Sequence, residues 1–277
     1  MKVLYAFAAA FLALTHAASW DSLKVTWNIN PFSGNSFADL PRDIKKDAMG
    51  FVLMDNQCNG NQPKGPFAGI RYWKDNDPAV VLIFDINGII AGIQTVVPKT
   101  NWALPPSTWL GSVITDDGKN FVLTAYFVDP KIICSSGRTP LDLLSQGTGT
   151  GLYIQNGSNP LTDLMIAAHD ESQTQQHTQW IFGHCFYTMG DHYWYNVRSD
   201  MPCNEFFPSF LLYNKKQLNA FGWAMNADLS SPRYEHPPHS LIGQFMNPVP
   251  QCFQTDSTFL KQSTMHIYFS SEISDLC

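Results

Sequence analysis

The stretch Ala79–Val97 reads AVVLIFDINGIIAGIQTVV, which is two apolar runs on either side of Asn87-Gly88. Branched and aromatic side chains dominate both runs, as is typical of β-strands. Asn-Gly readily adopts the two positive φ values of a type I′ turn, so the pattern predicts a β-hairpin with a two-residue loop. Because both faces of each run are apolar, we expect the two strands at the centre of a sheet that is covered on both sides.

Further strands are predicted along the rest of the chain. One hairpin pairs residues 112–115 with 121–128, and another pairs 210–213 with 218–223 around a polar four-residue turn. Shorter strands are expected at 23–27, 51–54, 69–73, 152–154, 180–187, 192–197 and 266–269. With 18 Gly and 18 Pro spread between these runs, the sequence predicts a mainly β protein, an antiparallel β-sandwich or barrel-like fold stabilised by disulfides.

Few helices are expected, and all of them are short. The clearest begins with Asn159 as N-cap and Pro160 at the first helical position and continues to Ala168. A second covers residues 39–46. The region near 145–160 is glycine-rich and could subdivide the chain, but residues 18–277 are expected to form one β-rich domain, because sandwiches of this length commonly do.

The N-terminus has the composition of a secretory signal peptide. Lys2 precedes an apolar run from Val3 to Leu14, which is too short to cross a membrane, and small residues lie around Ala17. Cleavage after Ala17 is expected, so that residues 1–17 are removed. No later run approaches the roughly 18 apolar residues that a membrane span needs. The sequence therefore predicts a secreted, extracellular protein without a membrane span.

The cysteines fit that compartment. Their number is even, and no Cys-x-x-Cys pair occurs that would indicate a zinc–thiolate or redox motif. We expect disulfides among Cys58, Cys134, Cys185, Cys203, Cys252 and Cys277. The pairing of Cys185 with Cys203 is favoured because it closes a short loop at low entropic cost, and Cys277 is expected to tether the C-terminus.

The charges and one short motif bear on partners. The chain carries 17 Lys and Arg against 23 Asp and Glu, without a basic cluster that could follow a phosphate backbone, and this argues against nucleic acid as a partner. A small molecule or a carbohydrate is the expected ligand. The sequence Asn156-Gly157-Ser158 predicts N-glycosylation at Asn156 in a surface loop.

Histidines cluster in one part of the chain. Of the seven histidines that follow Ala17, four lie between residues 169 and 192. Imidazole is a common ligand of zinc and copper and the usual general base near neutral pH. The predicted metal ligands are His184, His192, His236 and His239. Copper would suit these histidines with Met189 or Met225 as a weak axial donor, and zinc would suit them with a carboxylate such as Glu235 or Asp191.

The register of the hairpin around residue 190 decides whether two of these histidines can meet. With a two-residue loop, Tyr187 pairs with His192, and His184 points to the opposite face. With a three-residue loop, Phe186 pairs with His192, and the two histidines share a face. Only the second register permits a shared site.

Two functions remain open. The first is a secreted enzyme with a histidine-centred site, with or without copper or zinc, acting on a small or glycosidic substrate; its expected catalytic residues are His184, His192 and Asp191. The second is a non-catalytic secreted binding protein for defence, adhesion, or an egg or mucus matrix. The expected ligand-binding face in either case is aromatic and comprises Tyr193, Trp194 and Tyr195.

Overall fold

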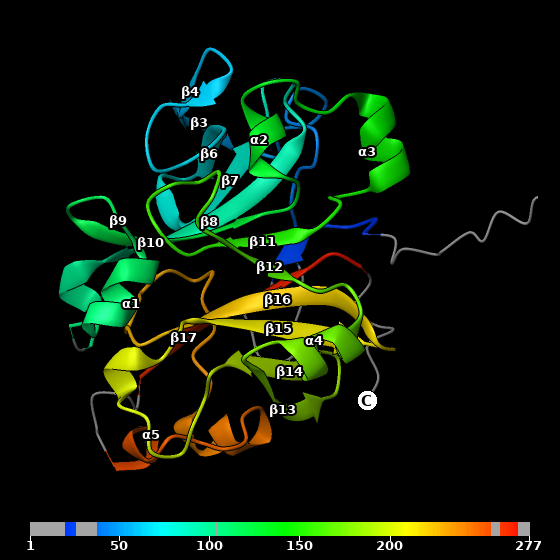
Figure 1. Cartoon of the computed structure of the whole chain (residues 1–277). Helices are drawn as coiled ribbons and strands as arrows, with labels where there is room; N and C mark the ends of the chain where they lie inside the picture. The colour runs from blue at the N-terminus through cyan, green and yellow to red at the C-terminus, as the bar shows by residue number, and fades with distance from the viewer. Residues whose placement is uncertain (1–19, 26–37, 104, 256–260, 271–277) are drawn as a thin grey trace, which may run out of the picture.

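The chain folds into two stacked antiparallel β-sheets with short helices at their edges (Figure 1). The computed structural model describes residues 20–25, 38–103, 105–255 and 261–270. The predicted signal peptide and Cys277 lie outside the described residues. The prediction of a mainly β, antiparallel fold with few short helices and disulfides is confirmed.

One sheet is built from residues 52–167. Its strand order is β12-β11-β10-β8-β7-β6-β3, and the short strand β9 also pairs with β10. The strands are β3 (Val52–Asn56), β6 (Ile70–Lys74), β7 (Asp77–Phe84), β8 (Ile90–Pro98), β9 (Thr115–Asp116), β10 (Asn120–Tyr126), β11 (Leu152–Gln155) and β12 (Leu164–Ala167). We call it the eight-stranded sheet. As the apolar runs predicted, β7 and β8 lie near its centre.

The other sheet has the order β13-β14-β15-β16-β17-β1-β2 and is called the seven-stranded sheet. Its strands are β1 (Lys24–Val25), β2 (Ala38–Asp39), β13 (Trp180–Phe186), β14 (Gly190–Tyr195), β15 (Ser209–Asn214), β16 (Gln217–Met225) and β17 (Ser263–Tyr268). A separate two-stranded ribbon consists of β4 (Cys58–Asn59) and β5 (Gln62–Pro63).

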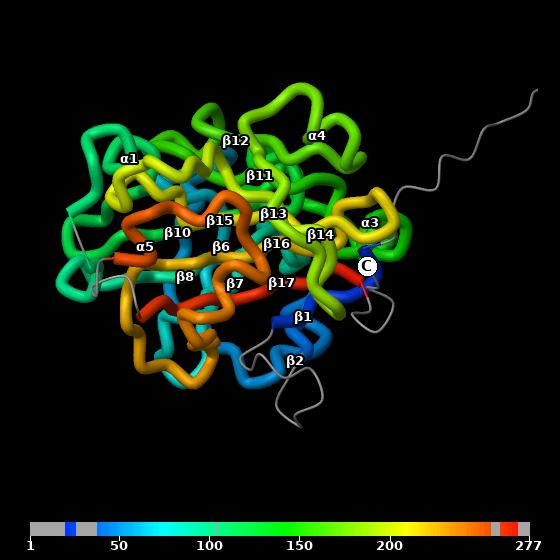
Figure 2. The backbone as a smooth tube through the Cα atoms, turned by 90° about the horizontal axis from the view of Figure 1, so that it is seen from below, coloured from blue at the N-terminus to red at the C-terminus, as the bar shows by residue number. Residues whose placement is uncertain are grey.

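Helices occupy the connections. The α-helices are α1 (Thr108–Val113), α2 (Pro130–Ile133), α3 (Pro140–Gln146), α4 (Glu171–His177) and α5 (Gln251–Thr255). Single 3-10 segments are η1 (Lys99–Asn101), η2 (Cys203–Glu205) and η3 (His239–Gln244). The chain passes from the eight-stranded to the seven-stranded sheet through α4. Segment 235–255, which contains η3 and α5, lies on the far side of the seven-stranded sheet (Figure 1, orange) and crosses in front of that sheet when seen from below (Figure 2).

The largest hydrophobic cluster lies between the two sheets. It includes Leu82 and Ile93 from the eight-stranded sheet and Leu211, Phe221 and Ile267 from the seven-stranded sheet, all fully buried. A second cluster lies on the outer face of the seven-stranded sheet, where alternate residues of the same strands pack against segment 235–255. The seven-stranded sheet is therefore covered on both faces.

The hairpin between β7 and β8 is confirmed, but its predicted type I′ turn is wrong. Gly88 has a positive φ of 86°, whereas Asn87 does not adopt one. The N–H of Gly88 donates to the carbonyl of Asp85 at 3.0 Å, and Asp85 and Ile89 close the loop. The carboxylate of Asp85 accepts from the N–H groups of Asn87 and Ile89, which stabilises a three-residue loop that ends in glycine.

The hairpin predicted at 210–223 is confirmed as β15 and β16. Its two-residue turn consists of Lys215 and Lys216, which have φ values of 49° and 69°. These values are unusual for lysine. The carbonyl of Lys216 accepts from the N–H of Glu171, and its ammonium group lies 2.8 Å from the Glu171 carboxylate, so α4 holds the turn in place.

The predicted helix at 159–168 is wrong. Asn159 accepts from the N–H of Leu161, as an N-cap would, but the turn does not continue as a helix. Instead, Leu164–Ala167 forms β12 and pairs with β11. Strand pairing overrides local helix preference here, because β11 would otherwise be an open edge of the sheet.

Two other local predictions also need correction. Residues 39–46 form no helix, since Ala38–Asp39 is strand β2 and residues 44–46 form a turn. The strand predicted at 112–115 is reduced to β9, because Ser107 caps helix α1, which extends to Val113.

The predicted disulfide between Cys185 and Cys203 is wrong. Cys203 bonds Cys252, with Cα atoms 5.9 Å apart, and Cys58 bonds Cys134. Cys185 pairs in the sheet with Asp191 near the start of β14, whereas Cys203 follows the end of that strand. The length of a strand therefore separates the two sulfur atoms, which is too far for a disulfide. The observed bond ties segment 235–255 to η2.

The glycine-rich stretch that could have marked a subdivision lies within the part of the chain that forms the eight-stranded sheet. A Cβ atom on Gly147 or Gly149 would lie 2.0 Å from the carbonyl oxygen of Trp20 or Phe127, respectively. These glycines therefore permit close backbone approach, and the crossing between the sheets comes later in the chain, at α4.

We predict that Asp85→Ala lowers the free energy of unfolding by about 3 kcal/mol, because it leaves buried N–H groups without acceptors. The Asp85 carboxylate also accepts from the N–H of Arg138 at 2.7 Å. Asp117 is a matched control, since it accepts from the N–H groups of Lys119 and Asn120 in an exposed turn. Asp117→Ala should cost about 1 kcal/mol or less. Urea unfolding measures both, and equal losses would contradict the buried role of Asp85.

Candidate functional site

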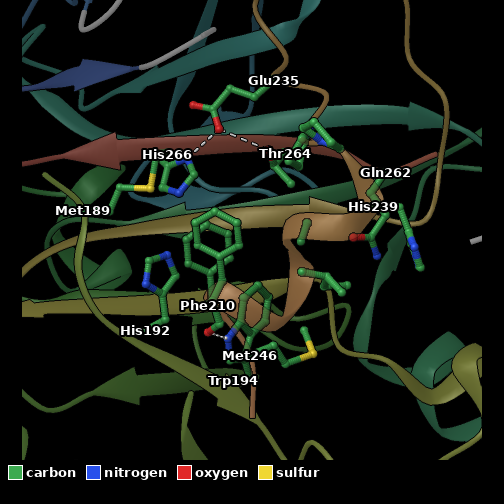
Figure 3. A pocket seen from close by; sticks show the side chains of 15 residues that line it. Met189, His192, Trp194, Phe210, Glu235, His239, Met246, Gln262, Thr264 and His266 are labelled. Atoms are coloured by element: carbon green, nitrogen blue, oxygen red, sulfur yellow. Dashed lines mark hydrogen bonds and ion pairs between the residues drawn. The ribbon is translucent and has the colours of Figure 1, made fainter. Parts of the chain in front are cut away.

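A cavity of about 50 Å³ lies between the outer face of the seven-stranded sheet and segment 235–255. Its wall is mainly apolar and aromatic, and His192 lies across it from His266, Glu235 and Thr264 (Figure 3). The cavity is lined, among others, by His192, His266, Glu235, Met189, Trp194 and Phe210. The space accommodates only a few non-hydrogen atoms, so the ligand portion that enters it must be small.

Because side chains alternate along a strand, His192 and His266 both face this cavity. In β14, His192 and Trp194 face the outer layer, while Tyr193 faces the core between the sheets. In β17, His266 faces the cavity, and its neighbours Met265 and Ile267 belong to the core between the sheets.

A glycine makes room between the two histidine strands. Gly222 of β16 pairs with Phe210 on one side and with His266 on the other. A Cβ atom at Gly222 would lie 2.2 Å from the Phe210 ring. Because Gly222 has no side chain, the Phe210 ring lies over β16 and contacts both histidines, with ring centroids 5.6 Å from His192 and 5.0 Å from His266.

His266 is oriented by a buried carboxylate. Its Nδ1–H donates to Oε2 of Glu235 at 2.7 Å, and Thr264 donates its hydroxyl to the same oxygen at 3.1 Å. His266 is 6% exposed and Glu235 is 3% exposed. The carboxylate fixes the tautomer of the imidazole and leaves the other ring nitrogen, Nε2, for a partner in the cavity.

His192 is also fixed by a hydrogen bond and is only 1% exposed. Its Nδ1 donates to the carbonyl of Gly190 at 3.1 Å. Burial, with a smaller contribution from neighbouring His266, lowers the pKa of His192 to about 3, so the ring is neutral at neutral pH. The centroids of the two imidazoles are 6.2 Å apart, with their planes at 83°.

The predicted metal ligands are not all brought together. His192 and His239 line the cavity, and Nε2 of His239 bonds the carbonyl of Phe253. His236 bonds the carbonyl of Leu229 at 2.8 Å and does not line the cavity. His184 is exposed. In the described ranges, no group of three or more His, Cys, Asp or Glu side chains is arranged to hold a metal ion.

The hairpin formed by β13 and β14 has a register that matches neither of the two registers predicted from the sequence. Phe186 pairs with Gly190 and Cys185 with Asp191, and the register shifts between Phe182 and Cys185. This bulge breaks the alternation on which both predicted registers depended. Gly183 and His184 both lie opposite His192 in this bulge, but His184 is exposed and does not line the cavity.

Asp191 lies outside the cavity, in a cluster with Glu171 of α4. Burial raises the pKa of Asp191, and the adjacent Glu171 carboxylate raises it further. Glu171 accepts from the hydroxyl of Tyr193 at 2.7 Å and pairs with Lys216. This cluster joins α4 to the sheet, so Asp191 is not positioned to act with His192 on one substrate.

The three predicted aromatic residues do not share a face. Tyr193 is fully buried between the sheets, whereas Trp194 lines the cavity and donates its Nε1–H to the carbonyl of Phe245 at 2.8 Å. Tyr195 is half-buried and stacks on Trp109, with centroids 6.2 Å apart. Alternation along β14 places Tyr193 and Tyr195 on the inner face and Trp194 on the outer face, so only Trp194 of the three can contact a ligand in the cavity.

Sequence reasoning missed His266 as a functional residue, treating it only as the start of a strand. The available signal was a histidine between Met265 and Ile267, in a strand with apolar neighbours on both faces. A polar side chain in such a strand is buried and needs a partner. Glu235 was considered only as a zinc ligand, whereas in the structure it orients His266.

Asn156, predicted to be glycosylated, is half-buried in the loop between β11 and β12, and its N–H donates to the carbonyl of Asp163 at 2.9 Å. The following serine of the motif is exposed. Glycosylation at this position stays a prediction.

Comparison of the chain with family models, with curated proteins and with solved structures found no match. None of the helices in the described part of the chain is long and apolar enough to cross a membrane.

The lowered pKa of His192 predicts that acid destabilises the fold. The unfolded chain binds a proton near the ordinary pKa of 6.5, whereas the folded chain binds it only near 3. Stability should therefore fall as the pH drops through this window, by up to about 1.4 kcal/mol per pH unit from this one group. Urea unfolding at pH 6.0 and pH 4.5 measures the loss.

His192→Gln should reduce that loss, because glutamine does not titrate. His266 and His184 are the neighbouring titratable side chains that act on His192, and both remain in the variant. An equal pH dependence in the wild-type protein and the variant would contradict the assignment.

Proposed function

We propose that the protein is a secreted enzyme whose active site is the cavity lined by His192 and His266. The observation that carries this proposal is the buried hydrogen bond between Glu235 and His266, which faces a second imidazole across an apolar cavity. A carboxylate that fixes the tautomer of a histidine, and leaves its second nitrogen directed at a small pocket, is a common arrangement for a group that moves a proton or binds a metal.

Each residue has a distinct role in this proposal. His266 presents Nε2 to the cavity as the group that moves a proton or binds a metal, and Glu235 is a positioning residue that acts through His266. His192 stays neutral because of its burial, so it offers Nε2 as a second contact. Trp194 and Phe210 exclude water and contact the apolar part of the substrate.

The size of the cavity favours a small substrate over a glycosidic one. About 50 Å³ accommodates only a few atoms, whereas a sugar ring with its hydroxyl groups needs more space and more polar partners. Two features support secretion. The described disulfides suit an oxidising environment, and residues 1–17 resemble a signal peptide.

The proposal predicts that His266→Gln lowers turnover by about 100-fold or more, since it removes the reactive nitrogen. Small chromogenic esters, amides and alcohols screened with the wild-type protein supply the assay. Glu235→Gln should lower kcat by a smaller factor and shift the pH profile of kcat, because the carboxylate only orients His266.

His184→Gln is the matched control, because His184 is exposed and lies in the strand next to His192. It should leave turnover unchanged. Turnover by His266→Gln equal to that of the wild-type protein would contradict the proposal. Ligand binding in the cavity without turnover of any class would favour the non-catalytic binding protein instead.

A further inference from the structure

Both cavity histidines have the surroundings that metal-binding histidines usually have. Nδ1 of His266 donates to the Glu235 carboxylate, and Nδ1 of His192 donates to the carbonyl of Gly190. Histidines that bind metals commonly donate their other ring N–H to a carboxylate or a backbone carbonyl, which orients the ring and strengthens the coordinating nitrogen. In both residues the coordinating atom would be Nε2.

A thioether lies in the same cavity wall. Met189 is 2% exposed and lines the cavity together with the two histidines (Figure 3). Its position is fixed because it belongs to the turn between β13 and β14. The N–H of Met189 donates to Phe186, and the hydroxyl of Tyr268 in β17 donates to the carbonyl of Thr188. A second thioether, from Met246, also lines the cavity.

The separation of the rings discriminates between metals. A metal–nitrogen bond of about 2.0 Å places an imidazole centroid about 3.1 Å from the ion. Two rings on a tetrahedral ion would then have centroids about 5 Å apart, and two rings on opposite sides of an ion would have centroids about 6.2 Å apart. The observed 6.2 Å fits the nearly linear arrangement. Copper(I) accepts two imidazoles in this way, whereas zinc prefers four ligands in a tetrahedron.

We propose that the cavity binds one copper(I) ion through Nε2 of His192 and Nε2 of His266, with the thioether of Met189 as a third, weaker ligand. Copper(I) is a soft ion, and thioether ligands select it over hard ions that require oxygen ligands. Since it needs only two or three ligands, the site does not require a third histidine or carboxylate. This inference rests on the proposed function, because it places a cofactor in the same cavity.

The test is a competition between the protein and the copper(I) chelator bicinchoninate, in thiol-free and oxygen-free buffer. No cysteine in the described ranges is free, so thiolates there do not compete for the ion. We expect one copper(I) per chain. Affinity should fall by about 100-fold in His192→Gln and His266→Gln, and by about 10-fold in Met189→Leu and Glu235→Gln.

Two variants serve as controls. Met225→Leu changes a buried methionine in the core between the sheets, and His184→Gln changes an exposed histidine. Both should bind copper as the wild-type protein does. If a histidine variant does not fold, Met189→Leu still tests the site, because leucine has nearly the volume of methionine and keeps the packing. X-ray absorption should detect a sulfur ligand in the wild-type protein and Met225→Leu but not in Met189→Leu.

A wild-type protein that leaves all copper with the chelator would overturn the inference, as would equal affinities of the wild-type protein and His266→Gln. In another outcome, the wild-type protein binds no copper while His266→Gln still loses turnover. That result would overturn the copper site alone and leave the proposed function intact. Copper bound at this site without turnover would support the inference and contradict the proposed function.

Discussion

The seven-stranded sheet is covered on both faces, and this constraint determines where the side chains of its strands lie. The eight-stranded sheet covers one face and segment 235–255 covers the other. Because side chains alternate along a strand, His192 and His266 must enter the outer apolar layer while Tyr193 enters the core between the sheets. A polar ring in that layer needs a partner, and the Glu235 carboxylate and the Gly190 carbonyl supply them.

The site depends on segment 235–255, which contributes Glu235 and the cavity wall opposite the sheet. Two contacts hold this segment in place. Glu235 and Thr264 exchange backbone hydrogen bonds of 2.9 Å, and the disulfide between Cys203 and Cys252 anchors its other end. The position of the Glu235 carboxylate and the shape of the cavity therefore both depend on how segment 235–255 packs on the sheet. A change that loosens this segment would disturb both.

Much of the fold could be predicted because it depends on local pattern. The runs in Ala79–Val97 are apolar on both faces, and the strands they form are central and doubly covered. Turn details could not be predicted, since they depend on distant residues. The Asp85 carboxylate that shapes one loop also bonds the backbone of Arg138, 53 residues away. The helix expected after Asn159 does not form, because residues 164–167 pair with β11 as a strand.

The site was predicted only in part. His192 was identified from clustering along the chain. His184 lies opposite it, in a bulge between Phe182 and Cys185 that local sequence does not reveal, but it is exposed and does not line the cavity. His266 lies far from the cluster in sequence and reaches His192 only through the order β14-β15-β16-β17 and the absence of a side chain at Gly222. Pairing of distant strands, which a single sequence does not specify, therefore creates the pair.

The central claim is that His192 and His266 both donate Nδ1–H to protein acceptors and present Nε2 to one cavity. Proton–nitrogen correlation spectra of the histidine rings, recorded on metal-free protein at pH 7.5, test it most directly. We expect both His192 and His266 to carry a proton on Nδ1, because Gly190 and Glu235 accept from Nδ1. An Nδ1 atom without a proton in either ring would contradict it.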